Sequence, residues 1–206
     1  YGTKLIACTS AHEKAVVTWD VLTGEQLSRV TGLHPSSIYS VEFSPDGKRF
    51  VTASWDNTAK LVDVETERVL HTFEGHDGYV QSASFSTDGK KIITSSWDGS
   101  TIIWDAVTGK RLVQLYIFDD DPNKWVHLHE SGLFDASEQA MNMMYWSVGM
   151  ETIDFTQLKN RYWEPGLWQK IMTNEPLRNV ENMDQLQLHP KVKLGELNGE
   201  GILEVE

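Results

Sequence analysis

The sequence predicts an all-β protein of the β-propeller type, and three observations support this. The segment from Ser44 to Asp63 recurs almost unchanged 42 residues later, from Ser86 to Asp105, and a period near 42 is typical of propeller blades. Each copy divides into short apolar runs separated by Asp-Gly or Thr-Gly turns, the pattern of strands linked by hairpins. Apolar residues form 40% of the 206-residue chain, enough for a sizeable core.

The blades are expected within residues 1–118. A partial first copy covers 4–27 and ends its third strand at Trp19-Asp20. The second copy predicts strands at 37–44, 49–54, 58–63 and 68–73, and the third at 79–86, 91–96, 101–105 and 111–116. About three blades do not close a propeller, so we expect further blades from a longer parent chain.

The repeat stops after the third copy, and three further segments are expected. Residues 119–150 predict a closing hairpin and a junction. Residues 151–185 predict a helical segment: Asp154 caps a helix over 155–163, and Pro165 starts a second one through Met172, with Leu167, Trp168 and Ile171 facing inward. Residues 186–206 alternate apolar and charged residues like the first strands of another β domain.

The blade residues resemble the WD-repeat family, which has Gly-His before the first strand, Ser in the second strand, Asp in the next turn and Trp-Asp ending the third. The third copy has His76, Ser96, Asp98 and Trp104 at these positions. The second copy has His34, Ser54 and Asp56, but Val62 replaces the tryptophan. The resemblance implies a buried hydrogen-bonded network that locks each blade, weaker by one partner in the second copy. Quinone-dependent dehydrogenase propellers are a rival family, but they lack the Gly-His and Ser-x-Asp elements.

A second resemblance concerns the junction. Ser-Gly-Leu-Phe-Asp-Ala-Ser at 131–137, Ser-Val-Gly at 147–149 and Glu-Pro-Gly-Leu at 164–167 look like the segment that follows bacterial WD-repeat propellers. In such proteins an immunoglobulin-like domain and a caspase-like peptidase domain come next. The resemblance therefore implies that 186–206 begin an immunoglobulin-like domain. No peptidase nucleophile can be assigned here, because the single cysteine, Cys8, lies in a predicted blade strand.

The resemblance also implies where a protein partner binds. WD-repeat propellers use the face that displays the loops before the first and third strands. The candidates there are Tyr39, Trp55, Tyr79, Gln81 and Trp97, since a few aromatic anchors carry most of the energy of an interface. The alternative is that Trp55 and Trp97 only pack against each other between blades.

Charge and composition exclude several classes of function. A net charge of −12 disfavours nucleic acid and anionic membranes. We expect no catalytic, cofactor or metal site, because the histidines and aspartates fit the structural network. One cysteine favours a reducing compartment, hence a cytoplasmic protein. The sequence predicts a non-catalytic scaffold that binds proteins; the alternative is a sensor region that regulates a caspase-like peptidase encoded outside this chain.

Overall fold

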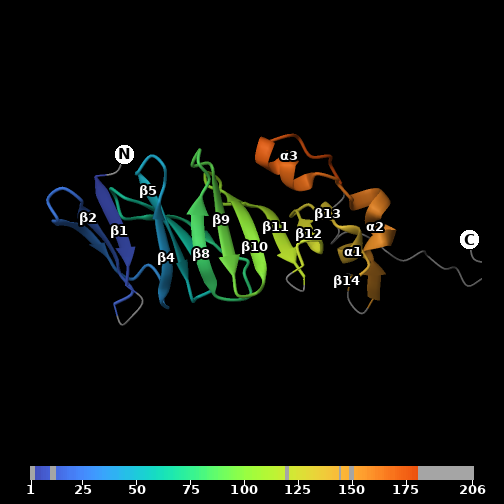
Figure 1. The fold of residues 1–206 in the computed structure, drawn as a ribbon, viewed down its shortest axis with the longest axis horizontal. Helices are drawn as coiled ribbons and strands as arrows, with labels where there is room; N and C mark the ends of the chain where they lie inside the picture. Colours follow the sequence, from blue (N-terminus) through green and yellow to red (C-terminus); the bar gives the residue numbers. More distant parts are fainter. Residues whose placement is uncertain (1–2, 10–12, 119–120, 144, 149–150, 181–206) are drawn as a thin grey trace, which may run out of the picture.

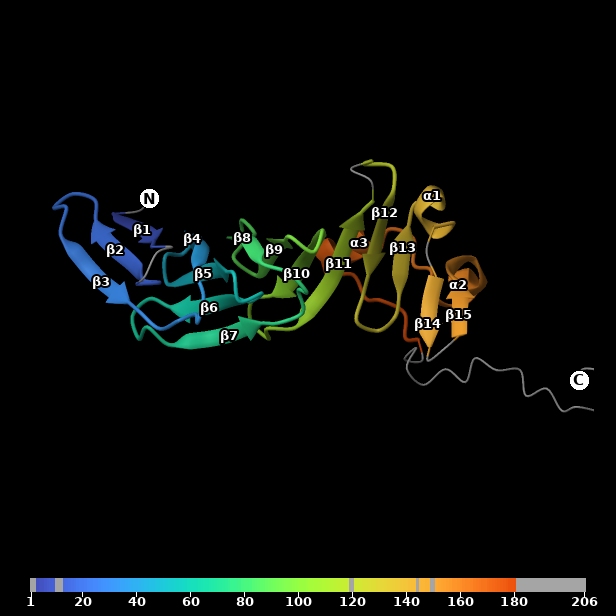
Figure 2. The same cartoon turned by 90° about the horizontal axis from the view of Figure 1, so that it is seen from below.

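The computed structural model describes residues 3–9, 13–118, 121–143, 145–148 and 151–180. The predicted β domain at 186–206 lies outside the described residues, and so does the side chain of the predicted cap Asp154. The described strands form antiparallel sheets that stand one behind the next along the molecule (Figures 1 and 2).

The first two sheets are the first two blades. The first contains three strands in the order β1-β2-β3 and the second contains four in the order β4-β5-β6-β7. Their bounds are β1 (Lys4–Cys8), β2 (Val16–Asp20), β3 (Gln26–Val30), β4 (Ile38–Phe43), β5 (Arg49–Ser54), β6 (Ala59–Asp63) and β7 (Val69–Phe73). The four strands of the second sheet agree with the predicted strands to within one residue.

The third sheet is larger than a regular blade. It contains β8 (Val80–Phe85), β9 (Lys91–Ser96), β10 (Ser100–Asp105), β11 (Arg111–Ile117), β12 (Trp125–Leu128) and β13 (Phe134–Ala136). The predicted closing hairpin, β12 and β13, pairs with the outer edge of β11 and extends the blade to six strands. The boundary predicted between residues 118 and 119 therefore falls inside one sheet.

Successive side chains along each strand point to opposite faces, and apolar side chains bury both faces of the second blade. Leu61 and Val62 are neighbours in β6 and point to opposite faces. Leu61 packs in the cluster shared with Ile92 of the third blade, whereas Val62 packs with Val16 of the first. Leu61 and Val62 are fully buried, and such burial is worth about 1.5–3 kcal/mol per side chain.

A polar contact also joins the second and third blades. The ring of His71 in β7 hydrogen-bonds through Nε2 to the carbonyl oxygen of Val107, at 2.9 Å. Gly109 lies in the same turn with φ +73°, and a Cβ there would lie 2.7 Å from Nδ1 of His71. This close approach explains the glycine of the Thr-Gly turn.

The remaining elements follow the third blade. They are α1 (Glu138–Met141), the paired strands β14 (Tyr145–Val148) and β15 (Glu151–Asp154), α2 (Phe155–Tyr162) and α3 (Leu167–Thr173). The strand pair was not predicted. The second predicted helix begins at Leu167 and not at Pro165, because Gly166 has the left-handed φ of +71° and cannot belong to the helix. No helix among the described residues is long and apolar enough to span a bilayer.

Helix α3 covers the far face of the third blade. Ile103 is the counterpart of Leu61 one period later, yet it packs against Leu167 and Ile171 of α3 rather than against another sheet. As predicted, Leu167 and Ile171 face inward, with 0% and 7% of their surfaces exposed, and Trp168 packs beside them. Lys91 is buried here too, and its Nζ lies 3.1 Å from the side-chain oxygen of Asn174.

Candidate functional site

Four aromatic rings form a continuous array at one edge of the second and third blades. Tyr39 stacks on Trp55 with ring centroids 5.0 Å apart, and Trp55 stacks on Tyr79 at 5.1 Å. Tyr79 contacts Trp97 at 6.0 Å with the rings inclined by 54°. We call these four residues the aromatic array.

Local backbone structure explains why the rings meet. Trp55 and Trp97 directly follow β5 and β9, and their backbone N–H groups donate to the carbonyl oxygens of Ser37 and Tyr79, both at 3.0 Å. Tyr39 occupies an irregularity in the pairing of β4 with β5, where one extra residue turns the strand. Two rings therefore come from the second blade and two from the third.

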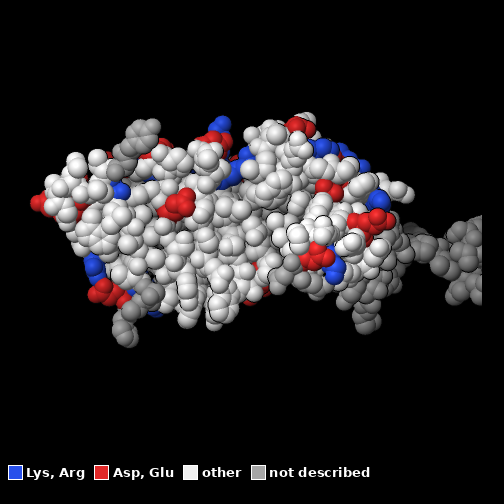
Figure 3. Space-filling view, viewed as in Figure 1, with Lys and Arg blue, Asp and Glu red and all other residues white. Residues whose placement is uncertain are grey.

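The array is accessible to a partner. The exposed fractions are 44% for Tyr39, 38% for Trp55, 41% for Tyr79 and 64% for Trp97. Gln81, the fifth predicted partner residue, is exposed as well and occupies the irregularity of β8 that corresponds to Tyr39. In Figure 3 the lower margin of the molecule beneath β4 and β8 is largely free of Lys, Arg, Asp and Glu.

The two tryptophans do not pack directly on each other. Tyr79 lies between them, in contact with both rings. In place of the alternative in which Trp55 and Trp97 pack against each other between blades, each of them packs against Tyr79. These contacts order the rings, since aromatic pairs contribute about 0.5–1.5 kcal/mol beyond the area that they bury.

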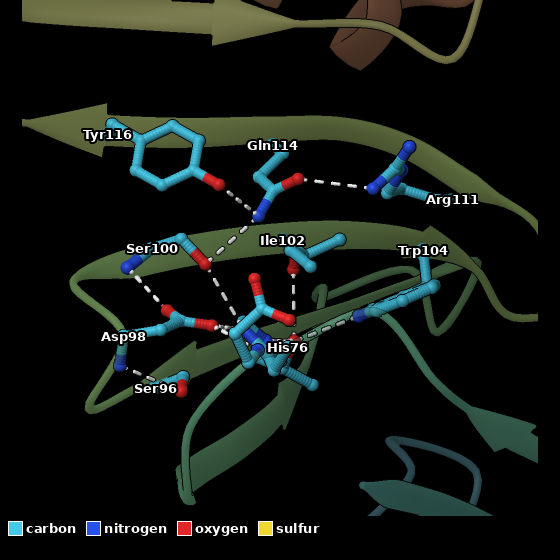
Figure 4. A network of polar contacts seen from close by, with 11 residues as sticks. His76, Ser96, Asp98, Ser100, Ile102, Trp104, Arg111, Gln114 and Tyr116 are labelled. Atoms are coloured by element: carbon cyan, nitrogen blue, oxygen red, sulfur yellow. Dashed lines mark hydrogen bonds and ion pairs between the residues drawn. The ribbon is translucent and has the colours of Figure 1, made fainter. Parts of the chain in front are cut away.

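Figure 4 shows a second constellation, the polar network of the third blade. Nδ1 of His76 lies 3.0 Å from a carboxylate oxygen of Asp98. Nε2 of His76 lies 2.8 Å from the hydroxyl of Thr94, which accepts from the indole N–H of Trp104, also at 2.8 Å. His76, Thr94 and Trp104 are all buried.

The charges of these groups are consistent with one arrangement of protons. Burial lowers the pKa of His76 below its ordinary value, although Asp98 opposes the effect. Burial by itself raises the pKa of Asp98, but hydrogen bonds from Ser100, Asp77 and His76 outweigh it, and the pKa is lowered. A neutral His76 then donates from Nδ1 to ionised Asp98 and accepts at Nε2 from the hydroxyl of Thr94.

The structure corrects one member of each predicted network. Ser96 does not contact His76; its hydroxyl accepts from the backbone N–H of Asp98 at 3.1 Å. Ser54 does the same for Asp56 at 3.2 Å. Both serines lie at the strand end beside the turn, and the network hydroxyl comes from the threonine two residues earlier. The two positions share a strand face, so alternation in the sequence could not separate them.

The second blade has the same network without the indole. His34 contacts Asp56 through Nδ1 and the hydroxyl of Thr52 through Nε2, both at 2.8 Å. Val62 occupies the position of Trp104 and is buried in the apolar cluster. One hydrogen-bond partner is therefore missing, and apolar packing takes its place.

The described residues offer little chemistry of other kinds. They contain no group of three or more His, Cys, Asp or Glu residues placed to hold a metal ion. Cys8 is half-buried, and burial raises the pKa of its thiol, which makes it a weak nucleophile. His127 lies between the rings of Trp125 and Trp168, with centroid distances of 4.5 and 5.5 Å.

Comparison with known proteins identifies the repeats. Residues 25–63 and 67–105 each match the WD40 family, described as WD domain, G-beta repeat. The protein tipD of Dictyostelium discoideum is 40% identical over 75 residues, which are 36% of this chain and 12% of that protein. WD repeat-containing protein 37 of Mus musculus is 46% identical over 44 residues, 21% of this chain and 9% of that protein.

A third relative is eukaryotic translation initiation factor 3 subunit I of Drosophila grimshawi, 41% identical over 59 residues, 29% of this chain and 18% of that protein. Each match thus covers less than a fifth of the relative's length. Each matched range contains the last strand of one sheet and the first three strands of the next, β3 with β4–β6 and then β7 with β8–β10, and the two ranges together contain both histidine networks. Two consecutive segments of the chain therefore match WD40 repeats, and their strands form antiparallel sheets consistent with blades of a β-propeller.

Proposed function

We propose that this chain is a non-catalytic, cytoplasmic scaffold module that binds a protein partner through the aromatic array. The observation that carries the proposal is four ordered rings, each at least 38% exposed, in contact with one another across two blades. Tryptophan and tyrosine dominate binding energy at interfaces, and rings that are already held in place lose little freedom when a partner binds.

The test compares the two edges of the blades. Trp55→Ala and Trp97→Ala are each expected to lower the affinity for a captured protein partner by at least about tenfold, because aromatic anchors that become buried in an interface commonly contribute about 2 kcal/mol or more. Leu22→Ala is the matched control, since Leu22 is 83% exposed in a turn at the opposite edge. A partner retained by both tryptophan variants, with the fold intact by circular dichroism, contradicts the proposal.

We propose further that another blade of a longer parent covers the outer face of the first blade. Leu5 is 56% exposed, whereas its counterparts Phe50 and Ile92 are 1% and 0% exposed beneath the preceding blade. In a Cys8→Ser background, Leu5→Cys is expected to react with iodoacetamide in residues 1–206 but to be protected in the parent protein. Equal labelling rates in the two forms would show that no blade packs there.

The alternative proposal is that the module is the sensor region of a bacterial multidomain protein with immunoglobulin-like and caspase-like domains. One observation favours it: two of the three segments that resemble the bacterial junction, 131–137 and 164–167, lie together. Asp135 accepts from the backbone N–H of Gly166 at 2.8 Å, and the N–H of Glu164 donates to the carbonyl of Phe134 at 2.7 Å. The intact mass of the native polypeptide tests it: a chain that ends near Glu206 would rule out the peptidase.

A further inference from the structure

We propose that the free face of Trp97, together with the carboxylate of Asp77, binds an arginine side chain that the protein partner presents. This inference rests on the proposed function and specifies the chemistry of the partner. Three features carry it: the position of Trp97 at the end of the aromatic array, the loop that places Asp77 beside it, and the negative charge around both.

Trp97 is the ring best placed to receive a cation. Trp55 is stacked on both sides, by Tyr39 and by Tyr79, so neither of its π faces is available. Trp97 has a single aromatic neighbour among the described residues, Tyr79, and that ring is inclined by 54° rather than stacked. With 64% of its surface exposed, Trp97 presents an open indole face, to which cations are attracted.

The loop before β8 is pressed against the turn that holds Trp97. The N–H of Asp77 donates to the carboxylate of Asp98 at 2.9 Å, and the N–H of Trp97 donates to the carbonyl of Tyr79 at 3.0 Å. Gly78 lies so close that a Cβ would be 2.8 Å from the backbone nitrogen of Asp98. These contacts fix the backbone of Asp77 beside Trp97 while its side chain is exposed.

The negative charges of Asp77 and Asp98 favour binding of a cationic side chain. No ion pair within the described part of the chain includes Asp77, so its carboxylate has no competing cation there. The pKa of Tyr116 is raised by burial and then by the negative charges of Asp98 and Asp77, although Arg111 opposes the effect. Arg111 itself is engaged, because its guanidinium donates to Gln114 at 3.1 Å.

Arginine fits this arrangement better than lysine does. Its guanidinium is planar and weakly hydrated, so it stacks on an indole face. The same group offers a fork of N–H donors to a carboxylate at its edge. Lysine supplies a compact, strongly hydrated charge that cannot do both.

The test uses residues 1–206 and three fluorescein-labelled peptides of four repeated dipeptides: Arg-Gly, Lys-Gly and citrulline-Gly. Citrulline keeps the shape of arginine and removes its charge. We expect fluorescence anisotropy to show the tightest binding for the Arg-Gly peptide and the weakest for the citrulline peptide. Trp97→Ala and Asp77→Asn are each expected to weaken binding of the Arg-Gly peptide by about two- to fivefold.

Glu65→Gln is the matched control for charge, because Glu65 is an exposed acid in a turn at the opposite edge. Non-specific attraction of a basic peptide to an acidic protein would respond equally to Asp77→Asn and Glu65→Gln, and that result would overturn the inference. Equal binding of the arginine and citrulline peptides would overturn it as well. If either happens while Trp55→Ala still releases the protein partner, the arginine site fails and the proposed function survives.

Discussion

Replacing Thr94 by valine tests the corrected network most directly. Valine keeps the shape of threonine but removes the hydroxyl, which lies 2.8 Å from Nε2 of His76 and 2.8 Å from the indole nitrogen of Trp104. Trp104 is 3% exposed and His76 is 6% exposed, so water cannot replace the lost partner. Two buried polar groups are left unsatisfied, and each costs about 1–3 kcal/mol.

We therefore expect Thr94→Val to lower the free energy of unfolding by about 2–6 kcal/mol. The matched control is Thr52→Val in the second blade, where Val62 has no indole N–H and only His34 loses its partner. That change is expected to cost about half as much. Ser96→Ala removes one hydrogen bond to a backbone N–H at the edge and is expected to cost about 0.5–1.5 kcal/mol.

The measurement is urea unfolding followed by circular dichroism, with hydrogen exchange to localise the effect. Exchange of the amides of β9 and β10 should accelerate in Thr94→Val, and the amides of β5 and β6 should respond in Thr52→Val. The reasoning fails if Ser96→Ala destabilises the protein as much as Thr94→Val does. It also fails if the two threonine variants cost the same, because the indole would then have no energetic role.

Three further results are expected. Burial lowers the pKa of His34 and of His76, so their contribution to stability is present above the ordinary histidine pKa of about 6.5 and is lost as the pH falls toward the lower folded value. Thermal unfolding should therefore occur at lower temperature at pH 5.5 than at pH 7.5, and a rise on acidification would contradict this. Gly109→Ala places a Cβ against the histidine ring of β7 and should lower the free energy of unfolding, measured by urea titration, by more than Gly24→Ala does. Gly24 has a similar φ of +72° but open space around it, so its replacement should cost about 1 kcal/mol. Asp135→Ala removes the acceptor of the Gly166 N–H. Hydrogen exchange of the α3 amides should then be faster, while exchange of the β5 and β6 amides is unchanged. Equal protection of α3 in the variant and the unmodified chain would show that this contact does not hold the helix.

Much of the fold was predictable because its signals are local. The period of 42 residues, the Asp-Gly turns and the alternation of apolar residues located the strands of the second and third blades to within one or two residues. The aromatic array residues were also singled out, through the resemblance to WD-repeat propellers, whose partners bind at the loops before the first and third strands. By contrast, the pair β14 and β15 was missed, because each strand has only four residues and Ser147 and Val148 were assigned to the junction.

The repeating unit could be identified from the residues alone: where strands begin and end, which turns need glycine, and which histidine and aspartate recur one period apart. These follow from the conformational preferences of a few neighbouring residues. The folded structure was needed to establish that Thr94 rather than Ser96 contacts His76, because both side chains point to one face and only the distance from the turn separates them. It also placed Tyr79 between the two tryptophans and α3 over Ile103, since both depend on how one sheet packs against the next element, and no local pattern encodes that geometry.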